Sequence, residues 1–262
     1  MTDWYLGTMG FAYEQWRNGV FYPAGMQPRQ YLGYYAERFN AVEMDSTFYA
    51  TPTEKTVQRW MQVTPPEFKI SPKVPRRITH ELRLHDAQGS FVTFLETMRL
   101  LGSNLGPIVL QFPPDFAFDS VGALIEFLPL LPKDLRFAIE FRHPSWHRPE
   151  TAVLLSQHHL CWVAADYIHL PKKLHRTTDF IYLRFIGPHG QYATKDREMV
   201  DKTADLQAWY TQIQPHLEEV TAVYAFFNND YAGFSPATCN KFKRVVGMEP
   251  GEIRPLQQGR LF

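Results

Sequence analysis

Apolar residues along the chain fall into short runs, each closed by a polar residue, a glycine or a proline. Short runs of this kind, rich in β-branched and aromatic residues, are typical of buried β-strands. The sequence therefore predicts eight strands, at residues 5–8, 41–45, 68–71, 107–112, 137–142, 160–166, 180–186 and 222–227.

Helical periodicity fills most of the intervals between these runs. Leu32, Tyr35 and Phe39 recur at the spacing of one helix face. Thr53 is placed to cap the next helix, which must end before Pro65. The predicted helices lie at residues 28–39, 53–61, 85–101, 121–128, 149–158, 204–217 and 235–247.

Strands that alternate with helices require a parallel sheet, and eight is the number of strands that closes a barrel. A doubly wound open sheet is the alternative, but the first strand-to-helix turn lacks the glycine fingerprint of that fold. We therefore expect a single-domain α/β protein, a (β/α)8 TIM-like barrel over residues 1–247. A C-terminal tail at residues 248–262, without periodicity, follows it.

The side-chain pattern within the strands gives a second argument for a barrel. Ala41, Glu43 and Asp45 share one strand face, and here as in other strands the last residue on that face is polar. A barrel filled with side chains and solvated at its carboxyl mouth has this pattern. The polar strand ends should then meet at one rim: Thr8, Glu43, Asp45, Lys73, Gln111, Glu140, Arg142, His143, Asp166, Arg184, Asn228, Asn229 and Asp230.

The fifth predicted strand ends in three ionisable residues that lie close together: Glu140 and Arg142 share a face, and His143 follows them. Active sites of TIM barrels lie at this end of the strands. We predict that Glu140 acts as a general acid or base, with Glu43 or Asp166 as its counterpart and His143 as a further catalytic candidate. The alternative is a structural network of ion pairs.

Cationic and glycine-rich positions predict an anionic substrate. Lys73, Arg142 and Arg184 would hold negative charge, and Lys73 is also a catalytic candidate. The loop at residues 187–192 contains glycines, and Ser235 is expected to cap the last helix, whose free amides would face the rim. Further substrate-binding candidates are Thr8, Thr47, Tyr49, Gln111, Asn228 and Asn229.

Composition narrows the class of protein. Lysines plus arginines number 27, as do aspartates plus glutamates, so no net charge holds the protein on nucleic acid or an anionic membrane. Cys161 and Cys239 lie far apart without ligand-like spacing, which favours reduced thiols. The sequence shows no signal-peptide pattern and no apolar run long enough for a membrane span. We expect a cytoplasmic protein without a membrane partner and without a cofactor.

Several short motifs occur in order along the chain. They are Gly7-Thr8, Phe21-Tyr22-Pro23, Val42-Glu43, Ser46-Thr47-Phe48-Tyr49, Lys73-Val74-Pro75-Arg76-Arg77-Ile78-Thr79-His80, Glu140-Phe141-Arg142-His143-Pro144-Ser145-Trp146 and Phe227-Asn228-Asn229-Asp230. With these motifs the chain resembles the domain-of-unknown-function 72 (YecE-like) family from Tyr5 to about Val246. The resemblance implies a TIM-like barrel and no particular activity. Asp45 stands where members of that family often carry asparagine.

Three functions fit these residues. The first is an enzyme, a hydrolase, isomerase or lyase, that uses acid/base chemistry on a small polar or anionic, sugar- or phosphate-like substrate. The second is a divalent-metal enzyme of the isomerase or phosphodiesterase type, with ligands from Glu43, Glu140, Asp166 and His143 or His80. The third is a non-catalytic protein that binds a ligand or nucleic acid, the latter across the basic loop at residues 73–83 with Phe48, Tyr49 and Trp146 stacking on bases.

Overall fold

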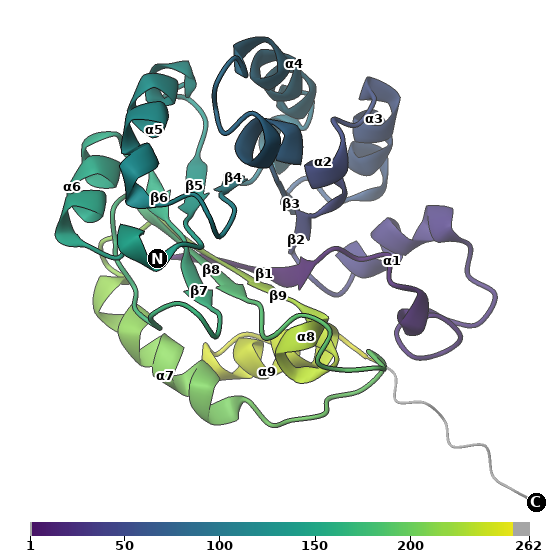
Figure 1. Cartoon of the computed structure of the whole chain (residues 1–262). Coiled ribbons are helices and arrows are strands. Elements are labelled where there is room, and N and C mark those ends of the chain that lie inside the picture. The colour runs from purple at the N-terminus through teal and green to yellow at the C-terminus, as the bar shows by residue number, and fades with distance from the viewer. Residues whose placement is uncertain (1, 254–262) are drawn as a thin grey trace, which may run out of the picture.

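The computed structural model describes residues 2–253, an α/β protein in which helices surround a central set of strands (Figure 1). In this part of the chain the paired strands run parallel. The strands are β1 (Asp3–Met9), β2 (Ala41–Met44), β3 (Lys69–Pro72), β4 (Ile108–Gln111), β5 (Phe137–Glu140), β6 (Cys161–Trp162), β7 (Ala164–Asp166), β8 (Phe180–Phe185) and β9 (Ala222–Phe227). The helices are α1 (Tyr31–Ala36), α2 (Ser46–Tyr49), α3 (Glu54–Val63), α4 (Gln88–Arg99), α5 (Val121–Phe127), α6 (Pro149–Gln157), α7 (Thr203–Ile213), α8 (Asn229–Ala232) and α9 (Ser235–Val245).

The strands form two sheets, one in the order β3-β2-β1-β9-β8-β7 and one in the order β4-β5-β6. The parallel α/β architecture that we predicted is confirmed. The continuous eight-stranded barrel sheet is not observed in residues 2–253. The predicted strand at residues 160–166 is divided between the two sheets: β6 and the N–H of Val163 bond to β5, whereas β7 pairs with β8.

The second interruption lies between β3 and β4. Isolated parallel bridges join Ile70 to Leu105 and Lys73 to Val109 at this edge. Pro72 and Pro107 lie at the same edge and have no N–H to donate, so a regular ladder cannot form there.

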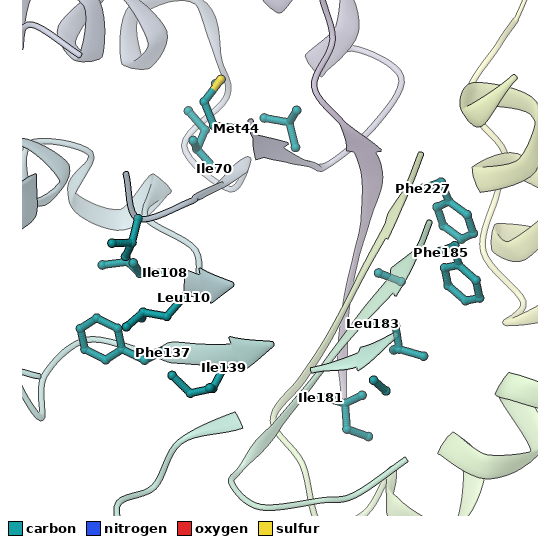
Figure 2. Close-up of a cluster of buried hydrophobic side chains, with 14 of the residues drawn as sticks. Met44, Ile70, Ile108, Leu110, Phe137, Ile139, Ile181, Leu183, Phe185 and Phe227 are labelled. Atoms are coloured by element: carbon teal, nitrogen blue, oxygen red, sulfur yellow. The ribbon is translucent and has the colours of Figure 1, made fainter. Parts of the chain in front are cut away.

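The two faces of the strands bury different sets of side chains. Outward-facing residues such as Ile139, Leu183 and Phe227 pack with the surrounding helices in the main hydrophobic core (Figure 2). The alternate positions form a second apolar cluster, which includes Ala138 and Tyr182. Because side chains alternate along a strand, Glu140 and Arg184 project on the same side as this second cluster.

Local differences from the prediction occur after the strands. The single-turn helices α2 and α8 follow β2 and β9 directly, and a π-helical turn at Arg77–Glu81 replaces part of the predicted basic loop. The predicted N-cap of the last helix is wrong. Phe234 precedes α9, and Ser235, already in the helix, donates from its N–H and its Oγ to Asn229 Oδ1, at 3.0 and 2.9 Å.

The first residues of the predicted tail pack on the rest of the chain. Asn240 and Gly251 exchange two hydrogen bonds, and Arg38 Nε donates to the carbonyl of Glu252. Residues 254–262 of the tail lie outside the described residues. Among the described helices, none combines the length and apolar character that a membrane crossing needs.

Candidate functional site

The carboxyl ends of the strands surround a cavity of about 450 Å³, which we call the mouth cavity. Its described lining includes four cationic side chains, Lys73, Arg76, Arg142 and Arg184, and one carboxylate, Asp45. The other lining residues are Met9, Phe48, Tyr49, His80, Gln111, Pro114, Tyr167, Ile186, His189 and Asn228. Strand ends that are far apart in the sequence therefore meet at one place, as the alternating pattern predicts.

Two buried carboxylates hold the arginines of the mouth cavity. Arg184 donates from Nη2 and Nε to the two carboxylate oxygens of Glu43, at 2.7 and 3.0 Å, and from Nη1 to Glu140. Arg142 donates from Nε to the other oxygen of Glu140. Tyr182 Oη donates to Glu43 Oε2 at 2.8 Å. The arginines face the cavity, whereas Glu43 and Glu140 lie beneath them and do not line it.

The pKa values of the two carboxylates shift in opposite directions. Burial works to raise the pKa of Glu140, but the guanidiniums of Arg142 and Arg184 outweigh it and lower the pKa to about 2. Burial raises the pKa of Glu43, with Arg184 opposing and Asp45 adding to the effect. Glu140 is therefore ionised at neutral pH with both oxygens occupied, which suits it to fix arginines rather than to transfer protons.

Lys73 lies at the end of β3 and reaches into the mouth cavity. Its Nζ lies 3.3 Å from Asp45 Oδ1, donates to Gln111 Oε1 at 3.2 Å, and stands 4.4 Å from the centre of the Phe48 ring. The side chain is almost fully buried. Lys73 and Gln111 thus occupy the cavity where the sequence analysis expects them.

His80 is a neutral side chain among these cations. Burial lowers its pKa to about 4, and the positive charges of Lys73 and Arg76 add to the effect. Its Nδ1 is hydrogen-bonded to Thr79 Oγ1 at 2.9 Å, and its ring meets Phe48 edge to face. At neutral pH His80 presents an uncharged imidazole to the cavity.

Asp166 is not part of this group. Its Oδ2 accepts hydrogen bonds from Trp209 Nε1 and Tyr231 Oη, each at 2.9 Å, and its Oδ1 lies 3.0 Å from Lys172 Nζ. The carboxylate is 5% exposed and does not line the mouth cavity. The structure thus separates Asp166 from Glu43 and Glu140. The Asp166 carboxylate joins β7 to α7 and α8 instead.

Four other predicted site residues also lie outside the lining. His143 accepts from the N–H of Ser145 through Nδ1, at 3.2 Å, and so caps a short turn. Thr8 donates to the carbonyl of Gly10, and Asn229 accepts from Ser235. Thr47 Oγ1 lies 2.8 Å from the carbonyl oxygens of Met44 and Lys73, which ties α2 to the end of β3.

The lining also contains residues that the sequence analysis did not select. Arg76 and His189 lie on segments that follow strands, and nothing in their local sequence separates Arg76 from its neighbour Arg77. Tyr167, directly after β7, lies under Arg142, with the guanidinium carbon 4.5 Å from the ring centre. This contact could have been anticipated, because Tyr167 follows a predicted strand end.

The metal alternative loses its geometric basis, and the nucleic-acid alternative loses one of its three aromatic residues. Within residues 2–253 no three His, Cys, Asp or Glu side chains are grouped as metal ligands, and the arginines occupy Glu43 and Glu140. The predicted stacking of Trp146 on nucleic-acid bases is wrong, because that ring is fully buried and stacks on Phe141 at 3.9 Å.

Fold and site together define a class: a parallel α/β protein with a cation-lined cavity at the carboxyl ends of its strands. Within that class, the family model for the protein of unknown function DUF72 matches residues 5–260. The chain therefore belongs to the DUF72 family, and the predicted resemblance is confirmed.

Relatives in sequence and structure carry names without an activity. The chain is 35% identical over 112 residues to the UPF0759 protein YecE of Escherichia coli K12 and 26% identical over 152 residues to the UPF0759 protein YunF of Bacillus subtilis 168. These matches span 43% and 55% of this chain, and 41% and 52% of those relatives. A DUF72 crystal structure from Thermotoga maritima MSB8 superimposes with a TM-score of 0.79 at 30% identity, covering 94% of this chain and 99% of that one. One from Enterococcus faecalis V583 gives 0.78 at 22% identity, covering 97% and 99%.

Proposed function

We propose that this protein binds a small phosphorylated or carboxylated compound in the mouth cavity and acts on it by acid/base chemistry. The observation that carries the proposal is the set of four cationic side chains that face one cavity beside a single carboxylate, Asp45. An anion bound there replaces water next to several fixed positive charges, in a cavity where such charges interact more strongly than in bulk solvent.

The buried carboxylates support this role indirectly. Glu43 and Glu140 hold Arg184 through Nε, Nη2 and Nη1, and Glu140 holds Arg142 through Nε, so that both guanidinium planes are already oriented when an anion arrives. Glu140, predicted from sequence as the acid or base, is in this proposal a positioning residue. Proton transfer falls to Lys73, as a donor held by Asp45, and to His80, as a neutral acceptor.

A barrel-like arrangement of the strands and a cytoplasmic location are also part of the proposal. We propose that the two sheets act as one barrel-like wall, supported by the bridges between β3 and β4 and by the continuity of residues 161–166 through β6 and β7. A cytoplasmic location also stays part of the proposal, and the two buried, unpaired cysteines are consistent with it. Hydrolase, isomerase and lyase activities all fit the same groups.

Titration calorimetry with inorganic phosphate and with citrate tests the binding. The parent protein should bind at least one of them with saturation. Lys73→Met should weaken the binding by about tenfold or more, because it removes a charged donor from the cavity. Lys55→Met, an exposed lysine of α3 outside the lining, is the matched control and should bind like the parent protein. Absence of saturable binding of both anions to the parent protein would refute the proposal.

A further inference from the structure

A second cavity lies beside the mouth cavity. It has a volume of about 550 Å³. Its described lining comes from the segment after β2, the segment after β3 and the first turns of α4, and comprises Tyr49, Ala50, Thr51, Pro75, Arg77, Ile78, Gly89, Ser90 and Thr93. Tyr49 lines both cavities, so the two spaces adjoin at this residue. A ligand anchored in the mouth cavity can therefore extend across Tyr49 into this second space, which we call the side cavity.

Tyr49 is unusual for an aromatic residue in this protein, because 76% of it is exposed. The helix that carries it is held in place, since Thr47 ties α2 to the carbonyls of Met44 and Lys73, and Phe48 meets the Tyr49 ring edge to face at 5.6 Å. An exposed aromatic ring on a helix that is held in place favours stacking of a planar ligand ring, because a rigid ring loses little conformational entropy on binding.

The side cavity has the lining that a planar ring with polar edges requires. Ala50, Pro75 and Ile78 supply apolar surface. The Ser90 hydroxyl can donate or accept a hydrogen bond, and the Thr93 hydroxyl, which donates to the carbonyl of Gly89 at 3.1 Å, can accept one. Arg77 is the one ionisable cation among the described lining residues, in contrast to four in the mouth cavity. The side cavity is therefore suited to an uncharged ring rather than to a second phosphate.

We propose that the ligand is a phosphate ester of a ring-bearing compound, of the nucleoside monophosphate type. Its phosphate binds among the arginines and Lys73, and its ring stacks on Tyr49 and enters the side cavity. This inference rests on the proposed function, because the phosphate must occupy the mouth cavity. It adds the side cavity as the subsite that recognises the ring.

Calorimetry with three probes separates the two cavities: inorganic phosphate, phenyl phosphate and adenosine 5′-monophosphate. Stacking of one ring should make each ester bind the parent protein about fivefold or more tighter than inorganic phosphate. Thr93→Trp fills the side cavity from α4 and should remove this gain while leaving the affinity for inorganic phosphate unchanged. Val92→Trp puts the same side chain on the exposed neighbouring position outside the cavity, and it should keep the gain.

The outcomes distinguish this inference from the function on which it depends. If none of the three probes binds and citrate does not bind either, the proposed function fails. If citrate binds and none of the three probes does, the proposed function stands and this inference is overturned. If inorganic phosphate binds and neither ester binds more tightly, or if Thr93→Trp leaves the gain intact, only the side-cavity inference is overturned. A single-stranded oligonucleotide that binds far more tightly than the monophosphate, with a steep dependence on salt, would also overturn it in favour of a polymeric ligand.

Discussion

The cavities at the two ends of the strands balance their charges in different ways. At the amino ends a cavity of about 350 Å³ is lined by two acidic residues, Asp3 and Asp134, and two basic ones, Lys69 and Arg136. Its basic side chains reach exposed partners: Lys69 donates to a backbone carbonyl, and Arg136 lies 2.9 Å from the half-exposed Asp179. This end is neutralised by pairs at the surface.

At the carboxyl ends the neutralising carboxylates are buried under the arginines. Glu43 and Glu140 are at most 1% exposed, so the faces of Arg184 and Arg142 that point away from them are left to the mouth cavity. Similar residue types thus give a surface network at one end and a cationic cavity at the other. The carboxyl end is a candidate site because its neutralising carboxylates are buried, and not because it carries more charges.

The largest difference between the two ends should appear in stability. Arg184→Met leaves two buried carboxylates without their shared partner and should lower the free energy of unfolding by about 3–5 kcal/mol. Arg136→Met breaks a pair at the surface and should lower it by less than about 1 kcal/mol. Urea denaturation of both variants at neutral pH measures the two losses, and equal losses would contradict the contrast between the two ends.

The decrease in the free energy of unfolding at low pH should depend on Glu140 in particular. The folded pKa of about 2 lies below the ordinary 4.5, so Glu140 stabilises the fold above that pH, and the effect is lost as the pH falls toward 2. The shift corresponds to about 3 kcal/mol. Glu43 acts with the opposite sign, because its pKa is raised.

Glu140→Gln should therefore be less stable than the parent protein at pH 6, and the gap should narrow as the pH falls toward 2. Urea denaturation across this range measures the gap. Asp134→Asn at the amino end is the comparison at the surface. Its pKa is also lowered, by a hydrogen bond from Arg99, so its gap should have the same sign and be smaller than that of Glu140→Gln. A gap that stays constant for Glu140→Gln would exclude ionised Glu140 as its cause.

Some of this site could be predicted from sequence because its signals are local. Alternation along β5 put Glu140 and Arg142 on one face, and the two side chains are indeed bonded. Asp166 shows the same signal at a strand end, but its partners Trp209 and Tyr231 lie 43 and 65 residues further along the chain. No local pattern reveals such partners, so sequence alone could not exclude Asp166 from the site.

The division of the sheet has a comparable explanation. The strands themselves follow from short apolar runs, which are local. Closure of the sheet depends on whether β3 and β4 can form a regular ladder. Pro72 and Pro107 limit this ladder because they have no N–H to donate. That effect can be recognised only when it is known that these two strand edges face each other. In the same way, Arg76 lines the mouth cavity while Arg77, the first residue of the π-helical turn, lines the side cavity, a division that no local pattern reveals.

The smallest expected effect concerns His80, and it tests whether the cations of the mouth cavity act on one another through space. Lys73→Met removes one of the charges that lower the pKa of His80, so this pKa should rise from about 4 toward 6.5 while burial keeps it below that value. The pKa of His175, lowered by burial and by Lys173, should stay where it is. Titration of both imidazoles by NMR measures the two values. Equal shifts at both would indicate a general loosening of the fold, and no shift at His80 would show that the charge of Lys73 does not act on it.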